Sequence, residues 1–283
     1  MLTADQFDAL TVPIVDLYAD YETSVIVDIA RRLGNLNYSS AAWQVQRLTE
    51  SGSLYKDVIK ELSRLTGKSE AVLKEIFKRA GVKAINFDDK IYKEAGLKPI
   101  PLNLSPEMLK ALTAGLSKTN GILSNLTMTT AISAQRAFIN AADMAYMQVS
   151  TGAMSYDQAV RMAVKKVASD GLSVIDYASG HQDKVDVAMR RTVLTGVSQT
   201  AAELQIQRAE EMGSDLVQVS AHIGARNKGT GPANHESWQG KIYSRSGKSK
   251  KYPDFVKVTG YGTGEGLGGW NCRHSFFPYF EGL

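Results

Sequence analysis

The sequence predicts a mainly α N-terminal region followed by a small α+β, glycine-rich C-terminal module. One observation behind this division is that apolar residues recur at helical spacing through about the first 210 residues. The other is that twelve of the 24 glycines lie between Gly224 and Gly282, among many tryptophan, tyrosine and phenylalanine residues. Glycine permits turns and aromatic side chains fill a small core, so we expect this segment to be compact and rich in loops.

The composition is that of a folded globular chain. Of the 283 residues, 43% are hydrophobic and 22% are charged, which excludes a wholly disordered protein. At about 150 residues per domain the length allows two domains. We place the boundary near Gly213, which gives a helical region at 1–213 and a compact module at 214–283.

Charge and cysteine content exclude several classes of protein. No stretch approaches the roughly 18–20 uninterrupted apolar residues of a membrane span, and acids stand where an export signal would be basic. The single cysteine, Cys272, cannot form an internal disulfide, which fits a reducing compartment. The formal net charge of +4 is too small to imply by itself a nucleic-acid partner.

Helical patterns begin at residue 14. Residues 14–33 carry apolar side chains at helical spacing and the pattern stops at a glycine. Residues 53–65 and 69–80 predict two short amphipathic helices, ended by Gly67 and Gly81.

Capping signals mark the next helices. Ser-Pro-Glu at 105–107 combines a capping serine, a proline at the first helical position and an acid, which predicts a helix start. The helical pattern then runs to Gly152, and we expect a break near Gly121. Ser155 and Gln158 form a capping box before another apolar stripe.

The last long helix is predicted from about Gln182 to Met212. Periodic helices longer than about 25 residues are typical of coiled coils and extended assemblies, and an internal helix of a large bundle is equally compatible. In residues 216–223, β-branched residues alternate with other residue types. This pattern predicts a strand that enters the C-terminal module.

Three of the four histidines share the module with the single cysteine. His222, His235, Cys272 and His274 form a set of three nitrogens and one sulfur that suits tetrahedral zinc. A glycine-rich module of about 60–70 residues needs additional stabilisation, which a structural zinc would supply. The alternative is that the histidines bond backbone carbonyls around an aromatic core, with Cys272 as a small buried apolar residue.

The same residues allow catalytic interpretations. A cysteine among histidines could act as a nucleophile with its base, and the three histidines with Glu236 or Glu265 could form a metal-dependent nuclease centre. Neither arrangement has a recognisable spacing, so we expect a protein that is not an enzyme.

Residues 241–257 are strongly basic, with aromatic residues between the charges. Six lysines and arginines there oppose a single acid, Asp254. Such a segment is either a solvated loop or a flexible loop that contacts phosphates. The candidate DNA contacts are Arg245, Lys248, Lys250 and Lys251.

Three segments of the module carry a resemblance to a known family. They are His222-Ile-Gly-Ala-Arg226, then 235–244 with Trp238-Gln-Gly240, then 259–274, which ends in Asn271-Cys-Arg-His274. Together they resemble the phage minor capsid protein 2 family, which is similar to the wider group of Mu-type phage minor head proteins. Residues 180–283 carry the match, whereas the preceding residues are compatible only in their helical character.

The resemblance implies a structural virion component, made in the bacterial host cytoplasm and incorporated into the head. Minor head proteins of this group are associated with the portal vertex and are implicated in head assembly and genome delivery. The implied partners are the portal protein, on which the helices would dock, and other head proteins, with packaged DNA near the basic loop. Relatives in the wider group often carry a second cysteine at the position of His274, and histidine keeps the capacity to bind zinc.

Trp238, Gly240, Asn271 and Arg273 are expected to form the structural kernel of the module, together with Cys272 and His274. We expect Arg273, beside Asn271, to act as a hydrogen-bond clamp between loops. Two alternatives to the capsid role stay open here. They are a metal-dependent nuclease or toxin-like enzyme delivered with the genome, and a DNA-binding packaging accessory without sequence specificity.

Overall fold

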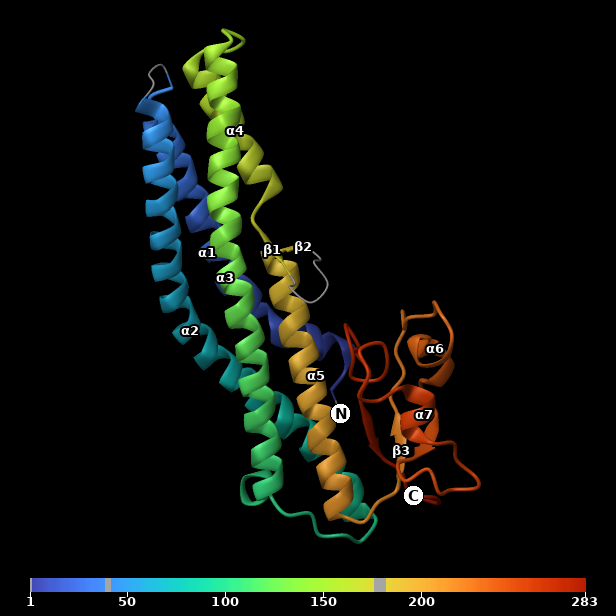
Figure 1. Ribbon diagram of the computed structural model, residues 1–283. Helices are drawn as coiled ribbons and strands as arrows, with labels where there is room; N and C mark the ends of the chain where they lie inside the picture. Colours follow the sequence, from blue (N-terminus) through green and yellow to red (C-terminus); the bar gives the residue numbers. More distant parts are fainter. Residues whose placement is uncertain (1, 39–41, 176–181) are drawn as a thin grey trace. The chain divides into compact units, whose positions relative to one another are not determined.

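The computed structural model describes residues 2–38, 42–175 and 182–283 (Figure 1). Four of its helices have 27 to 53 residues, compared with an average of about 11–12 in globular proteins. They are α1 (Ala4–Asn35), α2 (Ala42–Glu94), α3 (Pro106–Ser150) and α5 (Val185–Glu211). The shorter α4 (Tyr156–Asp170) and the 3-10 turn η1 (Leu102–Leu104) lie between them in sequence. The predicted mainly α region is therefore confirmed.

Helix α2 is continuous, so the prediction of two short helices at 53–65 and 69–80 is wrong. A side chain at Gly67 would meet open space, so glycine there costs the helix only its propensity, about 1 kcal/mol relative to alanine. The buried leucines on both sides of Gly67, Leu62 and Leu65 before it and Leu73 after it, outweigh that cost.

The predicted break near Gly121 is also absent, because α3 continues through the threonines that follow. The hydroxyls of Thr127, Thr129 and Thr130 donate to helix carbonyls three or four residues earlier, over 2.6–3.1 Å. These hydrogen bonds satisfy the hydroxyl groups within the helix, so the threonines do not interrupt it.

The capping box predicted at Ser155 is confirmed, whereas several predicted helix ends differ from the observed ones. Ser155 accepts the backbone N–H of Gln158, and the Gln158 side chain accepts the backbone N–H of Ser155. By contrast, α1 begins ten residues before the predicted start. Residues Gln182–Lys184 form strand β2, paired with β1 (Ser173–Ile175), so the predicted helix from Gln182 begins only at Val185.

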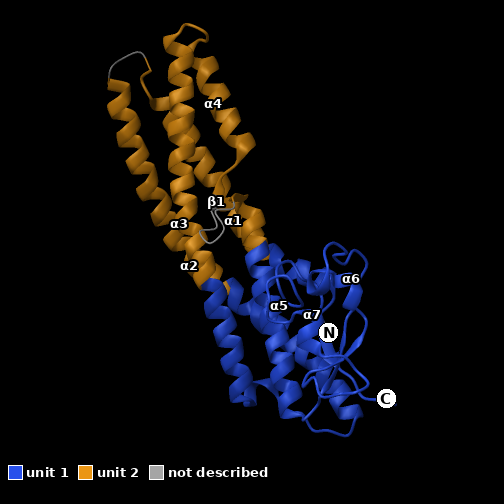
Figure 2. Ribbon diagram, turned by 45° about the vertical axis from the view of Figure 1, so that its right-hand side comes forward, with its two compact units in different colours: residues 1–12, 72–120, 191–283 blue, residues 13–71, 121–190 orange. Residues whose placement is uncertain are grey.

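The chain forms two compact units that alternate along the sequence (Figure 2). Unit 1 contains residues 1–12, 72–120 and 191–283, and unit 2 contains residues 13–71 and 121–190. The predicted boundary near Gly213 falls inside unit 1, two residues after α5 ends. Independent folding of 214–283 therefore stays a prediction. No helix in the described ranges is both long enough and apolar enough to cross a membrane.

The C-terminal part of unit 1 contains a small antiparallel sheet, which confirms the predicted α+β module. Strand β3 (Leu216–Val219) lies between β4 (Ile242–Ser244) and β5 (Phe276–Pro278), with Val217 opposite Tyr243 and Pro278. Short helical elements complete it: η2 (Gly231–Ala233), α6 (His235–Trp238) and α7 (Phe255–Thr259). Its core also includes Ala202 of α5, beside buried residues such as Trp238 and Phe276.

Within unit 1, α3 and α5 approach each other closely at two glycines. A Cβ atom at Gly115 would collide with the Thr200 side chain, and one at Gly196 would collide with the Thr119 side chain. Each helix therefore contributes one glycine and one threonine, four residues apart, to a reciprocal contact. Threonine is branched at Cβ and has few allowed rotamers, so its side chain cannot easily move away from an added Cβ atom.

Gly196→Ala should lower the free energy of unfolding by about 1–3 kcal/mol, because the added methyl group overpacks this contact. The matched control is Gly67→Ala in α2, where open space should allow a gain of up to about 1 kcal/mol. Urea unfolding followed by circular dichroism measures both variants. A Gly196→Ala protein as stable as the wild type would contradict the close contact.

Buried polar side chains connect α2, α5 and β5 in unit 1. The Gln205 amide donates to Asp88 (3.0 Å to Oδ2) and to the Phe276 carbonyl. Three residues further along α5, Arg208 is fully buried and forms ion pairs with Asp89 (2.9 Å) and Glu211 (2.8 Å). Burial raises the pKa of Asp88 to about 8, so its carboxyl group is mostly protonated at neutral pH.

Because the pKa of Asp88 is higher in the folded state than its ordinary value of 3.8, ionisation opposes folding. As pH rises, Asp88 loses its proton in the unfolded chain before it does so in the folded chain. The contribution of Asp88 to the free energy of unfolding therefore falls as pH rises from about 4 towards about 8. Asp88→Asn should remove that contribution and gain stability relative to the wild type as pH rises. Urea unfolding of both proteins at several pH values within this range measures the difference. A difference that is independent of pH would contradict a protonated Asp88.

Candidate metal centre and its surroundings

The four residues predicted to bind metal lie together, although they come from three segments of the module. His222 follows β3, His235 begins α6, and Cys272 and His274 precede β5. One ligand atom from each of His235, Cys272 and His274 lies within 4.8 Å of the others. The ring of His222 lies 4.2 Å from the ring of His274, centroid to centroid.

Each of the three histidine rings in this cluster has one nitrogen within hydrogen-bond distance of an oxygen atom. The pairs are His222 Nδ1 with the Ile223 carbonyl (3.0 Å), His235 Nε2 with the Glu265 carbonyl (2.8 Å) and His274 Nε2 with Gln239 Oε1 (3.1 Å). On its other side, His274 Nδ1 lies 3.7 Å from the sulfur of Cys272. Gln239 lies inside a segment that carries the family resemblance, but no sequence pattern indicates a role for it.

Burial sets the protonation of the cluster. Burial and the neighbouring histidines lower the pKa of His274 to about 3, and burial also lowers the pKa of His235. Burial raises the pKa of the Cys272 thiol. At neutral pH these two imidazoles are therefore neutral, which is the form that binds metal, and Cys272 lacks the lowered pKa of a reactive nucleophile.

The clamp between loops is made by Arg226 rather than Arg273. The Arg226 guanidinium donates to the carbonyls of Glu265 (3.3 Å) and Trp270 (2.9 Å). Arg273 instead forms an ion pair with Asp8 of α1, at 3.2 Å. The sequence-based expectation of an Arg273 clamp was wrong because the side chain points towards the helix, which adjacency to Asn271 in sequence did not reveal.

The other residues of the predicted kernel occupy structural positions. Trp238 is fully buried and donates from its indole nitrogen to the Pro232 carbonyl (3.0 Å). Gly240 has a φ of 71°, a left-handed conformation that favours glycine at this turn. Asn271 has a φ of 53°, and asparagine tolerates this conformation better than most residues.

A model of the family described as phage minor capsid protein 2 matches residues 2–283. The chain belongs to the phage minor capsid protein 2 family. The similarity seen over residues 180–283 thus extends to nearly the whole chain, including the long helices.

A curated relative of this minor capsid protein is a "structural protein" of Lactococcus phage LL-H. It is 24% identical over 254 residues, which cover 85% of this chain and 66% of the relative. The chain therefore spans just under two thirds of the length of that relative. No solved structure matches the chain significantly.

The family and the relative's name both denote structural proteins of phages. They confirm the predicted structural capsid role over a nuclease or toxin-like enzyme, and with it a place in the virion.

The basic segment of this minor capsid protein is partly neutralised. Arg245 donates to the Ser214 carbonyl (3.1 Å) and lies 3.6 Å from Glu210. Lys251 forms an ion pair with Glu281 at 2.7 Å.

By contrast, Lys248 and Lys250 are exposed, and no acid of the described chain pairs with either of them. Only these two of the four candidate DNA contacts therefore keep an uncompensated charge.

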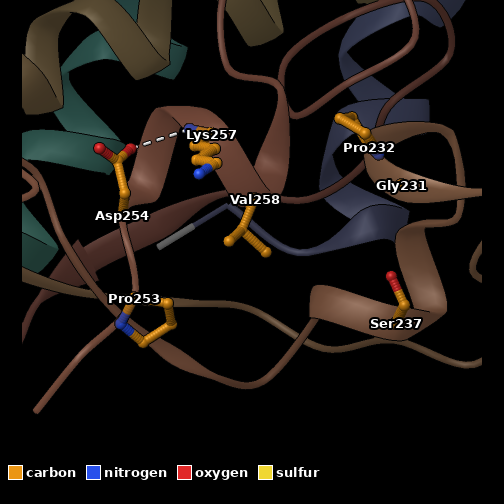
Figure 3. A pocket seen from close by; sticks show the side chains of 7 residues that line it. All are labelled: Gly231, Pro232, Ser237, Pro253, Asp254, Lys257 and Val258. Atoms are coloured by element: carbon orange, nitrogen blue, oxygen red, sulfur yellow. Dashed lines mark hydrogen bonds between the residues drawn. The ribbon is translucent and has the colours of Figure 1, made fainter.

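A pocket of about 500 Å³ is lined by residues of η2, α6 and α7 and by Pro253 and Asp254 (Figure 3). Its lining is mostly apolar, with Pro232, Pro253 and Val258. The Asp254 carboxylate at its edge already accepts the backbone N–H of Lys257 at 2.8 Å, as a helix cap. The only carboxylate among the pocket's lining residues is thus already engaged in the cap of α7.

Proposed function

We propose that this minor capsid protein occupies the portal vertex of the phage head, where it contributes to head assembly or genome delivery. We further propose that it is made in the bacterial host cytoplasm and then incorporated into the head. The observation that supports docking is the presence, in a capsid protein, of helices up to 53 residues long with large apolar side chains facing solvent.

Helix α2 carries the most suitable docking face. Val45 is 67% exposed and Leu48 is 61% exposed, and three residues apart they share one side of the helix. Both lie in unit 2. An apolar helix face of this kind binds in a groove of a partner protein.

The full-length chain should co-elute with the portal protein of its own phage in size-exclusion chromatography. Replacing Val45→Gln and Leu48→Gln together should weaken the complex about 10–100-fold, because truncated anchor residues cost about 2 kcal/mol or more. The matched control is Ile223→Ser, which changes a fully exposed apolar residue of the C-terminal module.

Affinity measured by calorimetry or biolayer interferometry separates the outcomes. Unchanged binding of the α2 double variant would refute docking through this face. Loss of binding in Ile223→Ser alone would place the contact on the C-terminal module instead.

A second candidate function is contact with packaged DNA through residues 241–257. The loop is anchored at its base, since Asp215 accepts the backbone N–H of Ser246 (2.7 Å) and the hydroxyl of Ser244 (2.6 Å). Lys248 and Lys250 lie in the middle of this segment and are exposed. Two exposed lysines, two residues apart and without acidic partners, favour phosphate contacts that do not depend on base sequence.

Duplex DNA binding should weaken as salt rises, and Lys248→Gln with Lys250→Gln should reduce the slope of log K against log salt by about 2. Each phosphate contact contributes about 0.9 to that slope. Lys251→Gln is the control, because its charge is already paired with Glu281. Fluorescence anisotropy over a salt series measures the three proteins. A DNA binding constant that does not change with salt concentration would exclude this contact, and so would an unchanged slope in the double variant.

A further inference from the structure

The orientation of one amide group fixes the protonation of the His274 ring. The backbone N–H of His222 lies 3.0 Å from Gln239 Oε1, and a backbone N–H can only donate. That Gln239 atom is therefore the oxygen, and His274 Nε2, which lies 3.1 Å from it, must carry the hydrogen. The lone pair of His274 is consequently on Nδ1, the atom that lies 3.7 Å from the Cys272 sulfur.

The same reasoning applies to the other two histidines. The Glu265 carbonyl can only accept, so His235 donates from Nε2 and keeps its lone pair on Nδ1. The Ile223 carbonyl can likewise only accept, so the hydrogen of the His222 ring lies on Nδ1. His222 Nε2 is shielded from solvent and has no hydrogen-bond partner in the described structure. A buried acceptor without a partner is unfavourable, and a bound cation would satisfy it.

We propose that His222, His235, Cys272 and His274 bind one zinc ion in a closed, structural site. The ligands are His222 Nε2, His235 Nδ1, His274 Nδ1 and the Cys272 thiolate. Zinc–sulfur and zinc–nitrogen bonds of about 2.3 and 2.05 Å at a tetrahedral angle place sulfur and nitrogen about 3.6 Å apart. The distance of 3.7 Å between Cys272 Sγ and His274 Nδ1 fits this value.

The donor set selects the metal and its role. Imidazole and thiolate are ligands of zinc, whereas calcium and magnesium require oxygen ligands, which this set lacks. Four ligands from the chain leave no open position for substrate or activated water, so the site is structural rather than catalytic. Histidines that bind zinc usually donate their other N–H to an oxygen, and all three rings do so here.

The ion would join three segments of the module that are far apart in the sequence. His222 belongs to the loop after β3, His235 to α6, and the other two ligands to the segment before β5. Zinc would hold these three segments around Trp238, whose ring lies 4.6 Å from the His235 ring and 4.9 Å from the His274 ring.

Elemental analysis of the purified full-length chain tests the proposal directly, and we expect one zinc per chain. After removal of zinc by a chelator, cobalt should restore binding with the visible bands of tetrahedral geometry and a thiolate-to-cobalt charge-transfer band. Removal of the metal should also lower the melting temperature of the chain, since binding to the folded state stabilises it.

Single substitutions separate ligands from neighbours. His222→Ala changes a partly buried loop residue outside the helices and strands, so it should preserve the fold while weakening zinc binding by at least about 10-fold. His274→Ala should abolish binding, and His274→Cys should restore it because cysteine is also a zinc ligand. Glu236→Gln is the matched control, because this exposed acid adjoins His235 but lies outside the ligand set.

Retained zinc in Glu236→Gln and His274→Cys, with loss in His274→Ala, would support the site. A folded wild-type chain that contains no zinc and binds no cobalt would overturn it, and the 3.7 Å contact would then be a thiol–imidazole hydrogen bond. Unchanged affinity in His222→Ala would overturn the four-ligand set.

Discussion

The buried polar side chains of α5 hold unit 1 together. Gln205 donates to Asp88 of α2 and to the carbonyl of Phe276 in β5, so one amide group connects a long helix to the edge of the small sheet. Arg208, one helical turn further on, is fully buried against Asp89, Glu211 and the carbonyl of Ile100. Such groups leave little freedom for rearrangement, because a buried charge that loses its partner costs about 3–5 kcal/mol.

This network makes the C-terminal module part of a larger body. Ala202 of α5 belongs to the module's core, the Ser275 hydroxyl donates to the Leu2 carbonyl, and Arg273 pairs with Asp8. Segments from the beginning, middle and end of the sequence therefore fold as one compact unit. The metal site proposed in the module therefore belongs to the same compact unit as most of α5, whereas the proposed docking face on α2 lies in unit 2.

Sequence reasoning succeeded where the signal was local or chemical. The capping box at Ser155 depends on residues three positions apart. The candidate metal ligands stood out because histidine and cysteine are rare in this chain, and the structure places them together. Sequence reasoning failed for the helix ends at Gly67 and Gly81, because packing by distant residues decides whether a glycine ends a helix. The roles of Arg226 and Gln239 were not predictable, since they depend on which loops the fold brings together.

The reciprocal glycine and threonine contacts between α3 and α5 have a mechanical consequence. Gly115 faces Thr200 and Thr119 faces Gly196, so the two helices run antiparallel in a fixed register. Sliding one helix by a single turn in one direction would bring Thr119 against Thr200, where the backbones are too close for two branched side chains. Sliding in the other direction would set Gly115 against Gly196 and leave a void. The helix pair therefore resists shear along its axis, and a load applied at one end of it passes to the other without slippage.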